Sequence, residues 1–128
     1  MPYYFSKLIE MKFDDALAHV TRALAAKGFG VLTTIDVRAT MKGKLGVEIP
    51  PYTILGACNP HFAWRALQAE NKIGTMLPCN VIVMETKPGT VEVAAVDPEA
   101  SMAAVGNPGL GQVASEVRRH LQEMVAGL

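Results

Sequence analysis

The spacing of apolar residues changes several times along this chain, and that change constrains the fold more than any other feature. Five short stretches have the β-branched or alternating pattern of strands, namely residues 3–9, 29–35, 52–57, 81–84 and 90–96. The last two are separated by Lys87-Pro88-Gly89, which suits a type II turn and predicts an antiparallel hairpin. Stretches with helical spacing lie between or after the strands, so the sequence predicts an α+β fold.

The predicted helices have recognisable ends. The first begins at Phe13 and stops at Gly28, because glycine readily takes the left-handed conformation that ends many helices. Asn59-Pro60 and Asp97-Pro98 each place a capping side chain before a proline, and this arrangement starts a helix. The helix after Asn59 is predicted to run to about Asn71, and the helix after Asp97 is predicted to be short.

Two of these helices have apolar residues whose spacing predicts a buried face. The final helix carries Val113, Val117, Leu121 and Met124 on one side. In the helix after Asn59, we expect Ala63, Trp64, Ala66 and Leu67 to face inward. The predicted architecture has two layers, with helices on one face of a mostly antiparallel sheet of about five strands. No linker-like segment divides the chain, so residues 1–128 form a single domain.

Charge and composition exclude several classes of function. The 128 residues include 12 Lys and Arg and 12 Asp and Glu, without a basic stripe, so nucleic acid is not an expected partner. No apolar stretch approaches the roughly 20 residues that span a bilayer, and the N-terminus lacks a signal-peptide pattern. We therefore expect a cytoplasmic protein with no membrane partner. Half of the residues are apolar, and this surplus favours a homodimer that buries part of it.

The segment 36–51 is longer than a simple strand connection needs, and long loops often border binding sites. We expect it to cover a pocket against the sheet, with the apolar side chains of Met41, Leu45 and Val47 pointing inward. Basic side chains should line the opening and favour an anionic or amphipathic ligand; they are Arg38, Lys42 and Lys44. The alternative is a solvated loop without a ligand.

Cys58 and His61 are the candidate catalytic residues. Cys58 precedes the capping Asn59, where free backbone N–H groups and the helix dipole favour a thiolate. His61 lies three residues further on and could act on that sulfur as a base, or share a metal with it. The alternative is a small buried thiol beside a solvated imidazole.

Cys79 lies between Pro78 and Asn80 at the start of the fourth strand. This turn either presents the Cys79 thiol and Asn80 at the rim of the ligand pocket or places the sulfur in the core. If a crossover helix of about 12 residues joins the third and fourth strands, it runs roughly 18 Å back along the sheet. Cys58 and Cys79 would then lie at opposite ends of the sheet, so we expect free thiols and no shared metal. The zinc-type Cys-x-x-Cys pair is absent, and no metal site is predicted.

Three segments of the chain resemble a known family. They are residues 52–60 (YTILGACNP), 73–81 (IGTMLPCNV) and 96–98 (VDP), and the LPCNV string is the most specific part. Over nearly its whole length the chain resembles the domain of unknown function 302 (DUF302) family. The resemblance implies an architecture similar to the TATA-binding protein, usually dimeric, in bacteria or archaea and sometimes near sulfur-metabolism genes. It implies no agreed activity and no catalytic residues, and a shared architecture does not imply DNA binding.

These observations leave three hypotheses about function. The first is a small dimeric ligand-binding or accessory protein, not an enzyme, with its pocket between the sheet and residues 36–51. The second is a cysteine-dependent redox or sulfur-handling protein that uses Cys58. The third is a structural module that only dimerises. The sequence names no cofactor or ligand for any of them.

Overall fold

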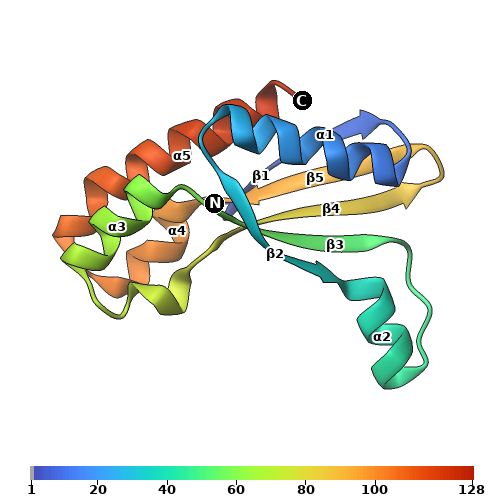
Figure 1. The fold of residues 1–128 in the computed structure, drawn as a ribbon, viewed down its shortest axis with the longest axis horizontal. Coiled ribbons are helices and arrows are strands. Elements are labelled where there is room, and N and C mark those ends of the chain that lie inside the picture. The colour runs from blue at the N-terminus through green and yellow to red at the C-terminus, as the bar shows by residue number, and fades with distance from the viewer. Residues whose placement is uncertain (1) are drawn as a thin grey trace.

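The computed structural model describes residues 2–128, which form one antiparallel sheet of five strands with helices packed against it (Figure 1). The strands are β1 (Tyr4–Glu10), β2 (Gly30–Asp36), β3 (Tyr52–Cys58), β4 (Cys79–Lys87) and β5 (Thr90–Val96). The helices are α1 (Phe13–Ala26), α2 (Val37–Leu45), α3 (Pro60–Ala69), α4 (Pro98–Met102) and α5 (Gly111–Ala126). Three short 3-10 turns follow α3 and α4: η1 (Ile73–Met76), η2 (Ala103–Val105) and η3 (Pro108–Leu110). The α+β class predicted from the sequence is confirmed.

The strands lie in the order β1-β5-β4-β3-β2, and every neighbouring pair is antiparallel. The predicted hairpin joins β4 to β5, and Gly89 takes the left-handed conformation in its turn, with φ of 84°. Helix α1 carries the chain from β1, at one edge of the sheet, to β2 at the other edge. Strands β4 and β5 lie between other strands in the interior of this order, and their central residues Val83 and Val93 are fully buried.

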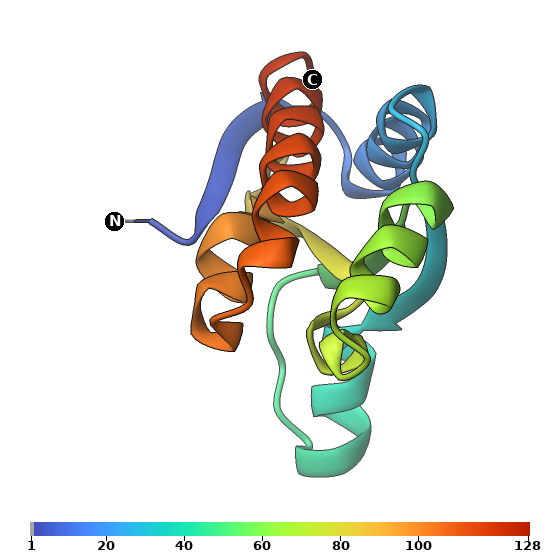
Figure 2. The same cartoon turned by 90° about the vertical axis from the view of Figure 1, so that its left-hand side faces the viewer.

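The pairing register of the strands shows which residues lie on each face of the sheet. Helices α1, α3, α4 and α5 lie on one side of it (Figure 2), and the residues facing them include Val81, Ala95 and Leu55, which are buried. Successive residues of a strand point to opposite faces. The other face therefore carries the alternate residues, and we call it the open face; across β1, β5, β4 and β3 it presents Leu8, Glu92, Met84 and Tyr52 in one row.

Helix α5 has the buried side predicted for it, because Val113, Val117, Leu121 and Met124 all lie in the core. The prediction for α3 is wrong in part. Ala66 is buried, but Trp64 is 63% exposed and Leu67 41% exposed. Helix α3 is apolar on several sides, so its sequence does not determine which side faces the core.

Helix α2 stands apart from the other helices and extends beyond the sheet (Figure 1). Asp36 caps its start by accepting a 2.9 Å hydrogen bond from the Ala39 N–H, and Gly46 ends it with φ of 67°. None of its residues is buried. Leu45 is 69% exposed and Val47 45% exposed, so the expectation that they point into a covered pocket is wrong. We refer to residues 37–51 as the arm.

Candidate functional site

Cys58 and Cys79 lie at the same end of the sheet, which corrects the expectation that they lie at opposite ends. Cys58 is the last residue of β3 and Cys79 the first of β4, and Ala57 stands directly opposite Cys79. The expectation assumed a crossover to a parallel strand. Because β3 and β4 are antiparallel, α3 and η1 must return the chain to the end of the sheet from which it left.

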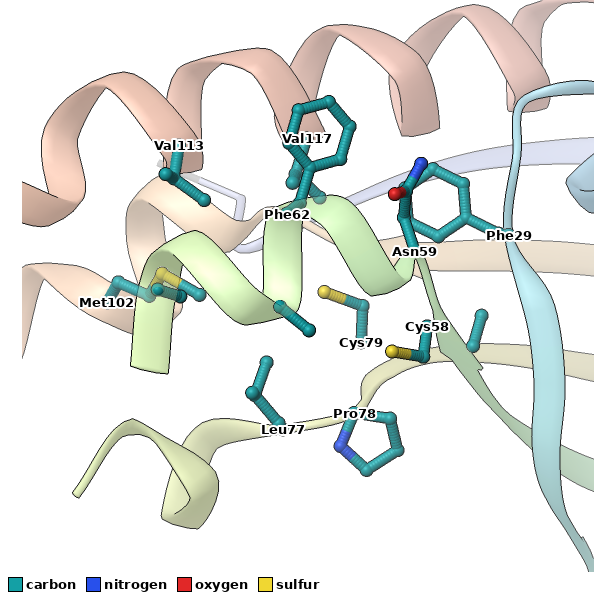
Figure 3. A pocket seen from close by; sticks show the side chains of 13 residues that line it. Phe29, Cys58, Asn59, Phe62, Leu77, Pro78, Cys79, Met102, Val113 and Val117 are labelled. Atoms are coloured by element: carbon teal, nitrogen blue, oxygen red, sulfur yellow. The ribbon is translucent and has the colours of Figure 1, made fainter. Parts of the chain in front are cut away.

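Both cysteines line a small, partly open space of about 30 Å³, which we call the cysteine cavity. Figure 3 shows their sulfur atoms between α3 and the Leu77-Pro78 segment. Phe62 and Met102 also border the cavity, so its walls are mainly apolar. The space is large enough for about one water molecule, and no substrate of ordinary size fits inside it.

The two thiols have different environments. Cys58 is half-buried, whereas Cys79 is only 8% exposed. Burial, and to a lesser extent the neighbouring Cys58, raises the pKa of Cys79 from its ordinary value of 9.0 to about 11. Because loss of the proton would place a negative charge in an apolar site, Cys79 stays a neutral thiol near neutral pH. Cys58 is therefore the more accessible of the two thiols.

His61 is not among the residues that line the cysteine cavity. Its side chain is exposed, and its backbone N–H donates a 3.1 Å hydrogen bond to Oδ1 of Asn59, the capping residue of α3. Asn59 is thus the capping residue predicted from the sequence, and it borders the cysteine cavity directly. The structure brings Cys58 together with Cys79 and places the imidazole of His61 at the surface.

The basic residues predicted to line a ligand pocket all lie on the exposed arm. Lys42 forms an ion pair with Glu48, with Nζ 2.6 Å from Oε1, and both side chains are largely solvent-exposed. Neither the cysteine cavity nor the hollows described below include Arg38, Met41, Lys42, Lys44 or Leu45 among their lining residues. These five residues therefore lie away from Cys79 and from Asn80, the other two members of the predicted ligand site.

A larger hollow of about 440 Å³ lies on the open face, and we call it the sheet hollow. Tyr3, Tyr4 and Tyr52 border it, and Ile82 and Met84 of β4 are among its apolar lining residues. The sequence alone does not reveal this hollow, because its lining residues come from β1, β3, β4 and β5 and from Tyr3 just before β1, which are far apart along the chain. The alternation of Asn80, Ile82 and Met84 was its one available signal, since these three side chains share a face.

Two polar side chains interrupt the apolar lining of the sheet hollow. Asn80 follows Cys79 and points to the open face, opposite Gly56 in the pairing of β3 and β4. Glu92 lies between Leu8 and Met84 in its row. Among residues 2–128, no ion pair involves the Glu92 carboxylate. The hollow therefore offers an acidic group without an ion-pair partner among the described residues, and three tyrosine side chains line the same hollow.

A third hollow, of about 430 Å³, lies beside α4 and the start of α5, and Glu99 and Asn107 are among its polar lining residues. Within residues 2–128, no group of three or more His, Cys, Asp or Glu side chains is arranged to hold a metal ion. No helix in the same part of the chain is long and apolar enough to cross a membrane.

Comparisons with known proteins place the chain in a family. A crystal structure described as an uncharacterized conserved protein DUF302 from Bacillus stearothermophilus is similar, with a TM-score of 0.89 and 24% sequence identity over 98% of both chains. An uncharacterized protein of Aquifex aeolicus (strain VF5) is 26% identical over 90 residues, which are 70% of this chain and 56% of that protein. The chain thus matches little more than half the length of that relative. Residues 5–128 match the family model described as domain of unknown function DUF302, so this chain belongs to the DUF302 family.

Proposed function

We propose that this protein binds a small molecule in the sheet hollow. The observation that carries the proposal is the hollow of about 440 Å³ on a face that none of the helices α1, α3, α4 and α5 covers. Binding pockets for small molecules commonly measure about 300–1,000 Å³ and combine apolar and aromatic walls with a few polar groups. Tyr52, Ile82 and Met84 supply such walls, and Asn80 and Glu92 supply the polar groups.

The charge of the hollow indicates which ligands it favours. Glu92 is the one charged side chain among its lining residues, and three tyrosine side chains accompany it. The faces of aromatic rings attract cations, by about 0.5–2 kcal/mol depending on how far the site excludes water. An apolar molecule that carries an ammonium group therefore suits the hollow. The proposed ligand is amphipathic, as the sequence also suggests. It is not anionic, because the basic residues that favoured an anion lie on the arm and not at the hollow.

The test compares two probes that share one carbon skeleton, phenylpropylamine and phenylpropanoate. We expect the amine to bind in an NMR titration and to perturb residues of the open face. Glu92→Gln should weaken its binding about tenfold, which corresponds to roughly 1.4 kcal/mol. The matched control is Glu99→Gln, which changes the third hollow and should leave the affinity unaltered. The proposal would be contradicted if neither probe bound, or if the carboxylate bound more tightly than the amine. Equal effects of Glu92→Gln and Glu99→Gln on the affinity for the amine would also contradict it.

We also propose that the protein is a cytoplasmic homodimer and that the arm contributes to the interface. Isolated helices shorter than about 12–15 residues are marginal in water, and α2 has nine residues without a buried side chain. Leu45 and Val47 expose apolar surface that a second copy of the chain would cover. Two free thiols, Cys58 and Cys79, are consistent with a reducing compartment.

Light scattering across a range of concentrations tests this assembly. The wild-type chain should have twice the 13.7 kDa mass of the monomer, and Leu45→Glu should shift the mass to that of the monomer. Leu67→Glu is the matched control, because Leu67 is also an exposed leucine but lies on α3, apart from the arm. A wild-type protein that stays monomeric at every concentration would contradict the proposal, as would dissociation caused by Leu67→Glu alone.

A further inference from the structure

We propose that Cys58 and Cys79 form a dithiol site that reacts with small aliphatic disulfides and closes into an intramolecular disulfide. The cysteine cavity shares no lining residue with the sheet hollow, so this proposal is independent of ligand binding there. It rests on three features of the structure: the separation of the two residues along the paired strands, the space beside their side chains, and their unequal exposure.

The strand pairing brings the two residues within reach of a disulfide. Cys79 stands opposite Ala57, and Cys58 is the next residue along β3. Opposed residues of antiparallel strands have Cα atoms about 5 Å apart, and each residue advances about 3.3 Å along its strand. Together these distances place the Cα atoms of Cys58 and Cys79 about 6 Å apart, within the range of roughly 4.4–6.8 Å that disulfides span.

The end of β3 allows the two side chains to converge. In a continuous strand Cys58 would point away from Cys79, because neighbouring positions alternate between faces. Here β3 ends at Cys58 and the chain turns through Asn59 into α3, and both cysteines line the cysteine cavity. The free space of about 30 Å³ beside them gives a thiol room to change rotamer without displacing α3. The local packing is therefore compatible with closure of the bond.

Unequal exposure sets the order of the reaction. Cys58 is half-buried at the edge of the cavity, so a small disulfide reaches it first. Cys79 lies deeper, and as a neutral buried thiol it reacts poorly with molecules in solution. Once Cys58 carries the incoming group, the sulfur next to Cys79 becomes an electrophile. Cys79 then acts as the resolving thiol.

The exchange needs no reactant besides the small disulfide, written RS–SR. In the first step the sulfur of Cys58 attacks one sulfur of RS–SR, the S–S bond breaks, and a mixed disulfide forms on Cys58. The departing RS⁻ takes up the proton that Cys58 lost. In the second step the sulfur of Cys79 attacks that of Cys58, and the second RS⁻ leaves with the proton of Cys79. One disulfide is reduced to two RSH molecules while the two cysteines are oxidised to one disulfide.

The first experiment treats the folded protein with oxidised glutathione, quenches samples with acid over time, and alkylates the remaining thiols before mass spectrometry. We expect a glutathionylated form on Cys58 to appear first and to be replaced by a form that has lost two hydrogen atoms. Peptide mapping should then show a Cys58–Cys79 link. The second step should accelerate as pH rises above neutrality, because Cys79 must lose its proton and burial raises the pKa of its thiol. A stable mixed disulfide on wild-type Cys58 would overturn the proposal.

Two variants separate the roles of the cysteines. Cys79→Ala should stop at the mixed disulfide, and Cys58→Ser should remain unmodified because Cys79 is buried. Circular dichroism checks that each variant folds. If one variant does not fold, the order of products in the wild-type time course still tests the proposal. Equal reactivity of wild type and Cys58→Ser, or a Cys58–Cys79 link that forms only after urea unfolds the chain, would also overturn the proposal.

Discussion

The Nε–H of Arg118 on α5 donates a 3.2 Å hydrogen bond to Oδ2 of Asp97, the residue that caps α4. The other carboxylate oxygen of Asp97 accepts a 3.0 Å hydrogen bond from the backbone N–H of Glu99. The Arg118 guanidinium carbon also lies 5.1 Å from the centre of the Phe5 ring on β1. Asp97 and Arg118 therefore connect three segments of the chain, at a carboxylate that is mostly buried.

Replacing Asp97 by alanine should lower the free energy of unfolding by about 2–3 kcal/mol. The variant loses the cap of α4, which is worth about 1 kcal/mol, and leaves a partly buried Arg118 without its main partner. Urea unfolding measures the change. Glu99→Ala is the control, since the Glu99 carboxylate is exposed and 3.7 Å from Arg118 Nε, and it should cost less than about 1 kcal/mol. Equal losses of free energy of unfolding for the two variants would show that the hydrogen bonds of Asp97 do not stabilise the fold more than the exposed Glu99 carboxylate does.

A second prediction concerns Gly56 on the open face of β3. A Cβ atom added at Gly56 would collide with the hydroxyl of Thr33 and approach Cγ of Pro78 to 2.7 Å. Gly56→Ala should therefore destabilise the fold by about 1–3 kcal/mol through overpacking. Gly30→Ala on β2 is the control, because no atom lies within 4 Å of its added Cβ. Thermal unfolding of both variants gives the comparison, and an unaffected Gly56→Ala would argue against this packing.

Much of the fold is predictable because its signals are local. Capping by Asn59 and Asp97, and the turn at Gly89, each depend on residues adjacent in the sequence. The inward side of α5 was also predicted, because its apolar residues occupy only one side of the helix. Helix α3 has apolar residues on several sides. The direction in which Trp64 points therefore depends on how α3 packs against the rest of the chain, and the sequence of the helix alone does not determine it.

The candidate site was less predictable, because it depends on how distant segments pair. The sequence identifies Cys58 and Cys79 as candidate site residues, but the direction of β4 decides whether they meet. Antiparallel and parallel returns of a strand after a helix have similar sequence patterns. The sheet hollow is not predictable from the sequence for the same reason. Tyr3, just before β1, and Tyr52 on β3 line the same hollow only because β5 and β4 pair between β1 and β3.

The exposure of Trp64 gives a third prediction. Its fluorescence in the folded protein should be quenched by acrylamide nearly as efficiently as in the urea-unfolded chain, because 63% of the side chain is exposed. Trp64→Ala should change the free energy of unfolding by no more than about 0.5 kcal/mol, as for most surface positions. Leu121→Ala, in the core, should cost about 2–5 kcal/mol. A strongly protected Trp64 would place α3 in a different orientation.

The last prediction uses the raised pKa of Cys79. In the unfolded chain this thiol is half deprotonated at its ordinary pKa of 9.0, whereas in the native state burial, with a smaller contribution from Cys58, moves that midpoint to about pH 11. Between these values the unfolded chain binds fewer protons, so the free energy of unfolding falls as pH rises. The contribution of Cys79 is complete below pH 9 and is lost above about pH 11. A shift from 9.0 to about 11 corresponds to a loss of about 2–3 kcal/mol.

The measurement compares urea unfolding of wild type and Cys79→Ala across this pH range under reducing conditions. Lysines and tyrosines also titrate there, so the informative quantity is the difference between the two proteins, which should shrink as pH rises. In Cys58→Ala the fall should persist with a smaller amplitude, because burial is the larger cause of the shift and the charge of Cys58 the smaller one. A difference between wild type and Cys79→Ala that stays constant with pH would mean that water reaches Cys79 in the native state.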